Sequence, residues 1–179
     1  MPCNQTLAGI ARDCTPSMGG IVAAYIANRD DIEGITVTSD KVSGFTLATG
    51  VTTPFHLYNF RKGTGSMTST LNVDQAAGSN FVSTDLLLQF SRMDTTKRIE
   101  IAALAVNELW VVVKEANGLY WLLGAEEPVV SSAGTGQTGT ARADGNYYQI
   151  TLQDNSSTFP IEVNVGSGAG QVDLDSLVA

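Results

Sequence analysis

Short apolar and alternating segments separated by turn residues characterise the first sixty residues. An apolar run, 21–27, lies between Gly20 and the polar and charged residues 28–31. The run is too short for a typical helix and is rich in β-branched and aromatic side chains, which favours a buried strand. Further segments with strand character follow at 35–38, 44–48 and 55–60.

A longer hairpin is predicted in the next part of the chain. Polar and apolar residues alternate from residue 63 to 78. In the following segment, 81–90, one face carries Val82, Thr84, Leu86, Leu88 and Phe90. Residues 75–80 supply small and polar side chains for the connection, so the two segments are expected to pair as antiparallel strands.

One helix is predicted, over residues 95–107. Asp94 or Thr95 can act as its N-cap. The apolar residues Ile99, Ala102, Ala103 and Val106 then recur at the spacing of one helical face.

The clearest local turn signal is Asn117-Gly118, between the β-rich runs 109–115 and 119–124. Asn-Gly in this position is typical of a type I′ turn, which needs positive φ at both central residues. Residues 131–140 have low complexity and are interpreted as a loop. Strands are predicted again at 147–152 and 161–165.

Together these segments predict a mainly β protein with eight or nine short strands. The whole chain, 1–179, is expected to form a single β-rich domain, a β-barrel or sandwich with one flanking α-helix at about residues 95–107. Residues 1–19 are interpreted as an N-terminal arm and residues 166–179 as a C-terminal tail. Such arms and extended loops suit oligomerisation.

The composition agrees with many turns and with self-association. Thr, Ser and Gly number 19, 14 and 18 among the 179 residues, whereas charged residues make up only 16%. An average globular chain has roughly 25% charged residues. The low value suits a protein that buries part of its surface against copies of itself.

Negative charge is concentrated in the last third of the chain. Residues 1–114 contain ten acids and nine bases, whereas residues 115–179 contain eight acids and only Arg142. The net charge of -8 argues against a protein that wraps the phosphate backbone of nucleic acid. The acidic third is either simply well solvated or a surface that repels nucleic acid, such as a passage through which DNA slides.

The sequence shows no pattern of a membrane-spanning helix or of a secretion signal. No window approaches the ~20 apolar residues of a membrane-spanning helix, and the first residues lack the basic and apolar regions of a secretion signal. The chain is therefore expected to be soluble and made in a cytoplasm. Cys3 and Cys14 are expected to be reduced thiols rather than a disulfide, and the ligand spacing of a structural zinc site is missing.

Candidate chemistry is sparse. The single histidine, His56, lies between Phe55 and Leu57, where a structural role is favoured over acid–base catalysis. The glycine-rich stretch 134–140 lacks the lysine of a phosphate-binding loop and is interpreted as a flexible loop. The acidic clusters lack a calcium-loop pattern and are interpreted as solvated: they are Asp30-Asp31-Glu33, Glu126-Glu127 and Asp173-Asp175. We therefore assign no catalytic, cofactor-binding or metal-binding residue and expect no enzyme.

Aromatic residues offer one alternative function. Trp110, Trp121, Tyr147 and Tyr148 could form a stacking platform of a β-sandwich that binds carbohydrate or a receptor. They lie within strand patterns, however, so core or interface positions explain them more simply.

A distinctive pattern covers four segments of the second half of the chain, 111–126, 136–140, 144–148 and 150–152, and extends loosely to 19–31. In these segments the chain resembles structural proteins of tailed phages and prophages of Bacteroidetes, most of all major tail tube proteins. The family implies a barrel or sandwich with a flanking helix, and no catalytic residues. It also implies a bridging element, here the hairpin at 63–90 or the N-terminal arm.

The resemblance further implies a homo-oligomer, a hexameric ring that stacks into a tube, with other tail proteins as partners. DNA would pass through an electronegative channel without specific binding, from capsid to host. The protein would belong to the tail of a virion assembled in a bacterial cytoplasm, without membrane insertion. Other virion components remain alternatives: a head–tail connector, a tail terminator or a decoration protein.

Overall fold

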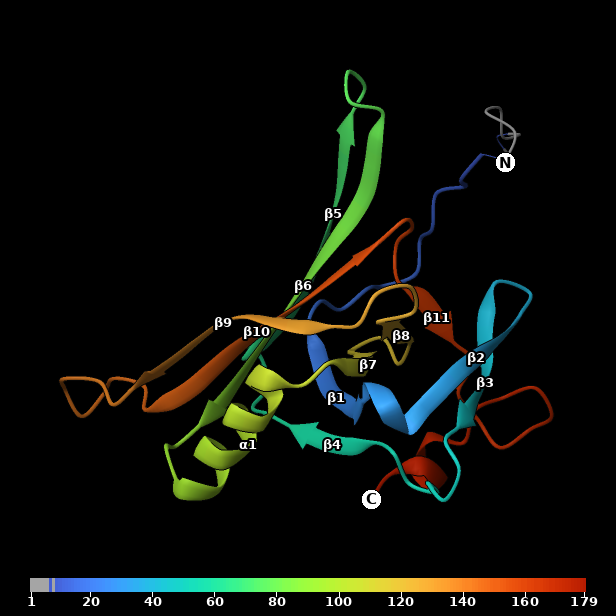
Figure 1. Ribbon diagram of the computed structural model, residues 1–179. Coiled ribbons are helices and arrows are strands. Elements are labelled where there is room, and N and C mark those ends of the chain that lie inside the picture. Colours follow the sequence, from blue (N-terminus) through green and yellow to red (C-terminus); the bar gives the residue numbers. More distant parts are fainter. Residues whose placement is uncertain (1–6, 8) are drawn as a thin grey trace.

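The computed structural model describes residue 7 and residues 9–179, which form two β-sheets and one α-helix (Figure 1). The strands are β1 (Ile21–Asn28), β2 (Ile32–Thr38), β3 (Lys41–Leu47), β4 (His56–Asn59), β5 (Gly65–Asp74), β6 (Ser79–Ser91), β7 (Leu109–Glu115), β8 (Tyr120–Leu123), β9 (Val130–Gln137), β10 (Tyr147–Ser156) and β11 (Ile161–Val163). The helix α1 spans Thr95–Val106, and two short 3-10 turns span Arg29–Asp31 and Leu174–Leu177.

The larger sheet has the strand order β2-β3-β11-β8-β7-β1-β4, and the smaller has the order β5-β6-β10-β9. Strands account for 50% of the chain and helix for 11%, so the predicted mainly β class with one helix is confirmed. Of the two architectures left open, the sheets of the described residues form a sandwich-like arrangement and no closed barrel.

Strand β1 lies between β4 and β7 and separates two hydrophobic clusters. Its residues Ala24 and Ile26 face the four-stranded sheet, whereas Tyr25 and Ala27 face the cluster around Phe55 on the other side. A strand covered on both faces needs apolar residues at successive positions, which explains the unbroken run that predicted a buried strand.

The helix forms where it was predicted, from Thr95 to Val106. Asp94 caps it by accepting a hydrogen bond from the Lys97 backbone N–H at 2.8 Å. Leu104 is buried and Ile101 packs against the core, whereas Ile99 and Val106 are exposed. The residues whose spacing predicted the helix are therefore not the ones that hold it against the core.

Two turns differ from the sequence prediction. Gly118 has φ +86°, but Asn117 has no positive φ, so the type I′ turn predicted there was wrong. The connection is longer by one residue: Gly118 donates to the Glu115 carbonyl, and Glu115 donates to the Leu119 carbonyl. Positive φ at two successive residues occurs instead at Ser39 and Asp40, which join β2 to β3.

The segment 131–140, interpreted as a loop, is largely strand. Residues 130–137 form β9, which pairs with β10 from Gln137 opposite Tyr147 to Val130 opposite Gln153. The hydrogen bonds between β9 and β10 join backbone groups only. Strand β10 can therefore hold the glycine- and serine-rich β9, although β9 has little strand preference of its own.

The two ends of the chain behave differently. Residues 9–19 contain no helix or strand and are exposed, in keeping with an arm. The predicted C-terminal tail, 166–179, instead packs on the body over its second half. Val172 and Leu174 are buried in the Phe55 cluster, and Phe55 exchanges backbone hydrogen bonds with Leu177 and Ala179.

Candidate assembly surfaces

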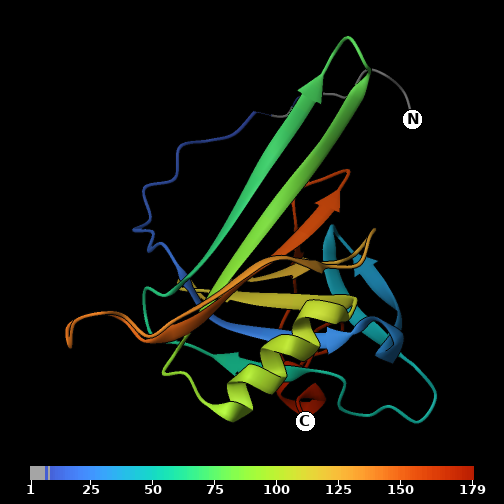
Figure 2. The same cartoon turned by 60° about the vertical axis from the view of Figure 1, so that its left-hand side comes forward.

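The most prominent surface feature is the hairpin formed by β5 and β6. Its ladder runs without interruption from Gly65 opposite Leu88 to Asp74 opposite Ser79. The outer part of this hairpin projects well beyond the rest of the fold (Figures 1 and 2). The predicted hairpin is therefore present.

The projecting part carries apolar side chains on the face that continues the core. Leu71 pairs with Val82, and Val73 pairs with Asn80, so Leu71 and Val73 share the face of the buried Leu86 and Leu88. Leu71 is 48% exposed and Val73 is 57% exposed. The apolar face of the sheet thus extends past the part of the fold that covers it.

Both sheets end in strands that can accept another strand. The edges are β5 and β9 in the four-stranded sheet, and β2 and β4 in the seven-stranded sheet. An edge strand presents backbone N–H and C=O groups on its outer side, a template for pairing with a second chain.

The helix also presents apolar side chains outward. Val106 is 81% exposed, and Ile99 is exposed one turn from the helix start. These two side chains are available for contact with another molecule.

The N-terminal arm is joined to the body at the β7–β8 turn. The Met18 N–H donates to Asn117 Oδ1 at 2.8 Å, and Asn117 Nδ2 donates to Ser17 Oγ at 3.2 Å. Upstream of this anchor Leu7 and Ile10 are almost fully exposed.

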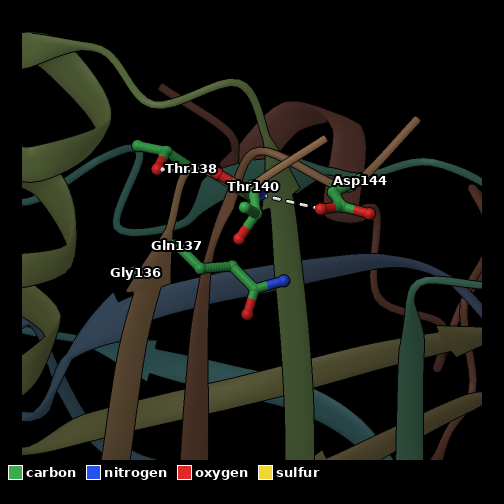
Figure 3. A pocket seen from close by; sticks show the side chains of 7 residues that line it. Gly136, Gln137, Thr138, Thr140 and Asp144 are labelled. Carbon is green, nitrogen blue, oxygen red and sulfur yellow. Dashed lines mark hydrogen bonds between the residues drawn. The ribbon is translucent and has the colours of Figure 1, made fainter. Parts of the chain in front are cut away.

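The glycine-rich stretch 134–140 ends in a polar hollow of about 610 Å³ at the β9–β10 connection. Figure 3 shows Asp144 directed at Thr140 across this connection. Asp144 Oδ2 accepts the backbone N–H groups of Thr140 and Ala141, both at 2.7 Å. These hydrogen bonds lower the pKa of Asp144. The amides that a phosphate would need are thus occupied by the chain's own carboxylate.

The remaining chemical candidates do not converge on a site. His56 is exposed on the edge strand β4. Cys14 is exposed, whereas Cys3 lies outside the described residues, so the prediction of two reduced thiols stays a prediction. Within residue 7 and residues 9–179, no group of three His, Cys, Asp or Glu side chains is placed to hold a metal ion.

The acidic clusters take part in local structure. Asp31 accepts a hydrogen bond from Asn28, Asp173 caps the turn at Leu174–Leu177, and Glu126 accepts two hydrogen bonds from Ser157. The bonds from Ser157 lower the pKa of Glu126. The acids of the last third lie in different parts of the fold, and Glu162 pairs with Lys41 at 2.7 Å.

The aromatic residues of the alternative binding function are not brought together. Trp110 is buried, and Trp121 donates a hydrogen bond to Glu115 within the seven-stranded sheet. Tyr147 and Tyr148 belong to β10 in the other sheet. The structure therefore gives no support for a shared stacking platform.

Sequence analysis missed a buried polar cluster between the sheets. Asp154 is only 2% exposed and accepts a hydrogen bond from the Gly124 N–H at 3.3 Å. Arg29 donates to the Gly124 carbonyl and lies over the Trp110 ring, 4.0 Å from its centroid. An aspartate at an inward position of an alternating strand, after Ile150 and Leu152, is the signal that could have identified it.

The helix in the described part of the chain is too short and too polar to cross a membrane. A scan of protein families found no match for the chain, and searches of curated proteins and of solved structures found none either.

Proposed function

We propose that this protein is a non-enzymatic subunit of a phage tail tube, which self-assembles into stacked rings around a channel for DNA. The observation that carries the proposal is the β5–β6 hairpin, whose apolar face continues the core into solvent at Leu71 and Val73. An apolar surface that leaves the body in this way is stabilised when another molecule covers it.

Free sheet edges provide a second support. Copies that join through β-strand edges form heterologous contacts, which close into a ring where the rotation between copies permits it. The chain offers four edge strands and an arm that is hydrogen-bonded to the body at Ser17 and Met18. These are the elements that a ring of repeated copies needs.

The charge supports the passage of DNA without binding. The net charge of the whole chain is -8. An overall excess of acids repels phosphate, so DNA would remain mobile in a channel built from copies of this chain. The purified protein should accordingly leave the electrophoretic mobility of duplex DNA unchanged at low salt.

Self-assembly is tested with the purified full chain. Negative-stain electron microscopy and sedimentation velocity over a range of concentrations should show rings or tubes. A strictly monomeric species at high concentration, also after addition of other tail proteins, would contradict the proposal.

Other virion components share much of this reasoning. A head–tail connector, a tail terminator or a decoration protein could use the same edges and hairpin. The copy number in the particle separates these functions, because a tube subunit occurs in many rings and a terminator in one.

A further inference from the structure

The outward side of α1 is an apolar stripe. Four exposed residues recur there at the spacing of one helical face: Ile99, Ala102, Ala103 and Val106. Ile99 is 58% exposed and Val106 is 81% exposed, whereas Leu104, on the inward side, is buried. Figure 2 shows α1 along the outside of the fold. Apolar residues on both sides are typical of a helix that is covered on both sides, so a partner is expected on the outward one.

The stripe is symmetric about its centre. Ile99 lies three residues before Ala102, and Val106 lies three residues after Ala103. Consider a second α1 that runs antiparallel across this face, with a two-fold axis between Ala102 and Ala103. Ile99 of each copy then lies opposite Val106 of the other, because a two-fold contact uses the same surface on both copies. The small alanines at the centre let the two helices approach to about 8 Å.

The N-terminal end of α1 is basic. Arg92 and Arg98 are exposed there, and within the described residues neither forms an ion pair. Lys97 is paired with Asp94, so the free positive charge at this end belongs to the two arginines. The helix dipole favours acids at a helix N-terminus, but the first turn contains none. These arginines therefore do not stabilise the helix itself, and their charge is available to a partner.

The C-terminal end of α1 is acidic. A polar hollow of about 430 Å³ lies there, lined by Val106 of the stripe and by three acids: Asp30, Asp31 and Glu108. Within the described residues none of these acids forms an ion pair, and the last turn of the helix contains no base. Arg29, a base that also lines the hollow, donates to the Gly124 carbonyl. The hollow therefore keeps negative charge for a cationic group from outside.

We propose that two copies of this chain pair through the outward sides of α1, antiparallel and about a two-fold axis between Ala102 and Ala103. Ile99 of each copy covers Val106 of the other. Arg98 of each copy reaches the acidic hollow beside Glu108 of the other. The antiparallel direction brings a basic end to an acidic end at both ends of the contact, whereas a parallel pair would bring like charges together.

The pair is a state of the free protein and goes beyond the proposed tube. Each copy uses α1 once, so the two-fold contact closes at two copies and adds no third. Copies in rings that all point the same way are not related by such an axis. The contact covers two turns of helix, about 11 Å. Stable complexes bury roughly 800 Å² per partner, more than two turns supply, so the pair forms reversibly at high protein concentration.

Charge reversal in the full chain tests the pairing. R98E places an acid opposite Glu108, and E108R places a base opposite Arg98. Each alone should raise the dimer dissociation constant about tenfold in sedimentation equilibrium, because like charges then meet at both ends of the contact. An equimolar mixture of the two variants has opposite charges at both ends and should dimerise like the unchanged protein. The double variant R98E/E108R should do the same.

The apolar part of the contact is tested by I99S/V106S. This variant should also raise the dimer dissociation constant about tenfold, because each copy loses two apolar side chains from the contact. The matched controls are R12E and E127R, which make the same charge changes at exposed positions elsewhere, and V37S, at an exposed valine of β2. All three controls should dimerise like the unchanged protein. Circular dichroism and thermal melting confirm folding of every variant.

The outcomes separate this inference from the proposed function. R98E or I99S/V106S with the dissociation constant of the unchanged protein overturns the α1 pairing, and so does a mixture of R98E and E108R that stays monomeric. Rings or tubes in electron micrographs without an α1-dependent dimer overturn the pairing alone. A dimer that depends on α1, with no rings or tubes under any condition, supports the pairing and contradicts the proposed function.

Discussion

The Gly124 N–H donates a hydrogen bond to Asp154 Oδ1 at 3.3 Å and thereby joins the end of β8 to β10 of the other sheet. The Gly124 carbonyl accepts from Arg29, so one residue connects a buried carboxylate to a guanidinium. Burial raises the pKa of Asp154 to about 6 against the hydrogen bond from Gly124, which lowers it. Because burial favours the neutral carboxyl, the stability of the fold should change with pH as Asp154 titrates.

The first prediction concerns Asp154→Asn. Because the pKa of Asp154 is raised to about 6 from 3.8, the folded protein binds the proton more tightly than the unfolded chain. The protonated Asp154 side chain thus makes its full contribution to stability at low pH. As pH rises from about 4 to about 6 this contribution is lost, and the free energy of unfolding falls by about 3 kcal/mol. Asn, which is neutral throughout, should raise the free energy of unfolding above pH 6 and remove this slope.

Urea unfolding at pH 4, 5, 6 and 7.5 measures the effect. Asp85→Asn is the matched control, since Asp85 lies on the exposed face of β6. This substitution should leave the pH dependence of the free energy of unfolding unchanged. A D154N protein that is less stable than the unchanged protein at pH 7.5 would show that the charged form of Asp154 stabilises the fold.

The second prediction compares two glycines with similar backbone conformation. Gly124 has φ +92°, and a Cβ there would lie 3.0 Å from the Leu109 carbonyl oxygen and 3.2 Å from Val129 Cγ2. Gly118 has φ +86° and no atom within 4 Å of its Cβ position. Gly118→Ala should cost only the backbone strain, about 1 kcal/mol, and Gly124→Ala should cost clearly more because Leu109 and Val129 must also move.

Thermal unfolding of both variants gives the comparison. Equal losses would mean that the β8–β9 connection shifts freely to admit a methyl group, and that the close approach of Leu109 to Gly124 is not needed for the contact between the sheets.

The third prediction concerns the β9–β10 connection. Asp144 is held by the N–H groups of Thr140 and Ala141, which lower its pKa below the usual range. The contact is therefore present above the ordinary carboxyl pKa and lost as pH falls through the lowered value. Asp144→Ala should accelerate amide exchange at Thr140 and Ala141, whereas Asp144→Asn, which keeps an acceptor oxygen, should change it less. Unaltered exchange in the alanine variant would show that the loop is held by other contacts.

The sequence predicts the strands that have an apolar pattern of their own. Residues 21–27 and 81–90 form β1 and β6 with small shifts at their ends, because the apolar residues that mark these segments in the sequence are the ones buried in the fold. It does not predict β9, whose place depends on pairing with residues 147–153 of β10, which come later in the chain. The packing of Val172 and Leu174 likewise depends on the distant Phe55.

The candidate assembly surfaces were predictable only in outline. Alternation indicated the hairpin at 63–90, but not that Leu71 and Val73 stay about half exposed on the face that carries the buried Leu86 and Leu88. The gathering of Arg61, Arg92 and Arg142 near one end of the four-stranded sheet was hidden, because these residues are far apart in sequence. Only the pairing of β6 with β5 and β10 brings their connections to one end.

The last prediction uses the turn that the sequence did not reveal. Ser39 and Asp40 join β2 to β3 with φ of +53° and +59°, the left-handed region at both central positions. L-residues other than Gly pay roughly 1–2 kcal/mol there, and Asn-Gly is the preferred pair. Ser39→Asn with Asp40→Gly should therefore raise the free energy of unfolding by about 1 kcal/mol.

The reverse exchange, Asn117→Ser with Gly118→Asp, should lower the free energy of unfolding, since Gly118 is the only one of that pair with positive φ. Urea unfolding of both double variants checks the signs, and a loss of stability in the first would mean that the Ser39 and Asp40 side chains stabilise the turn more than their backbone strain costs.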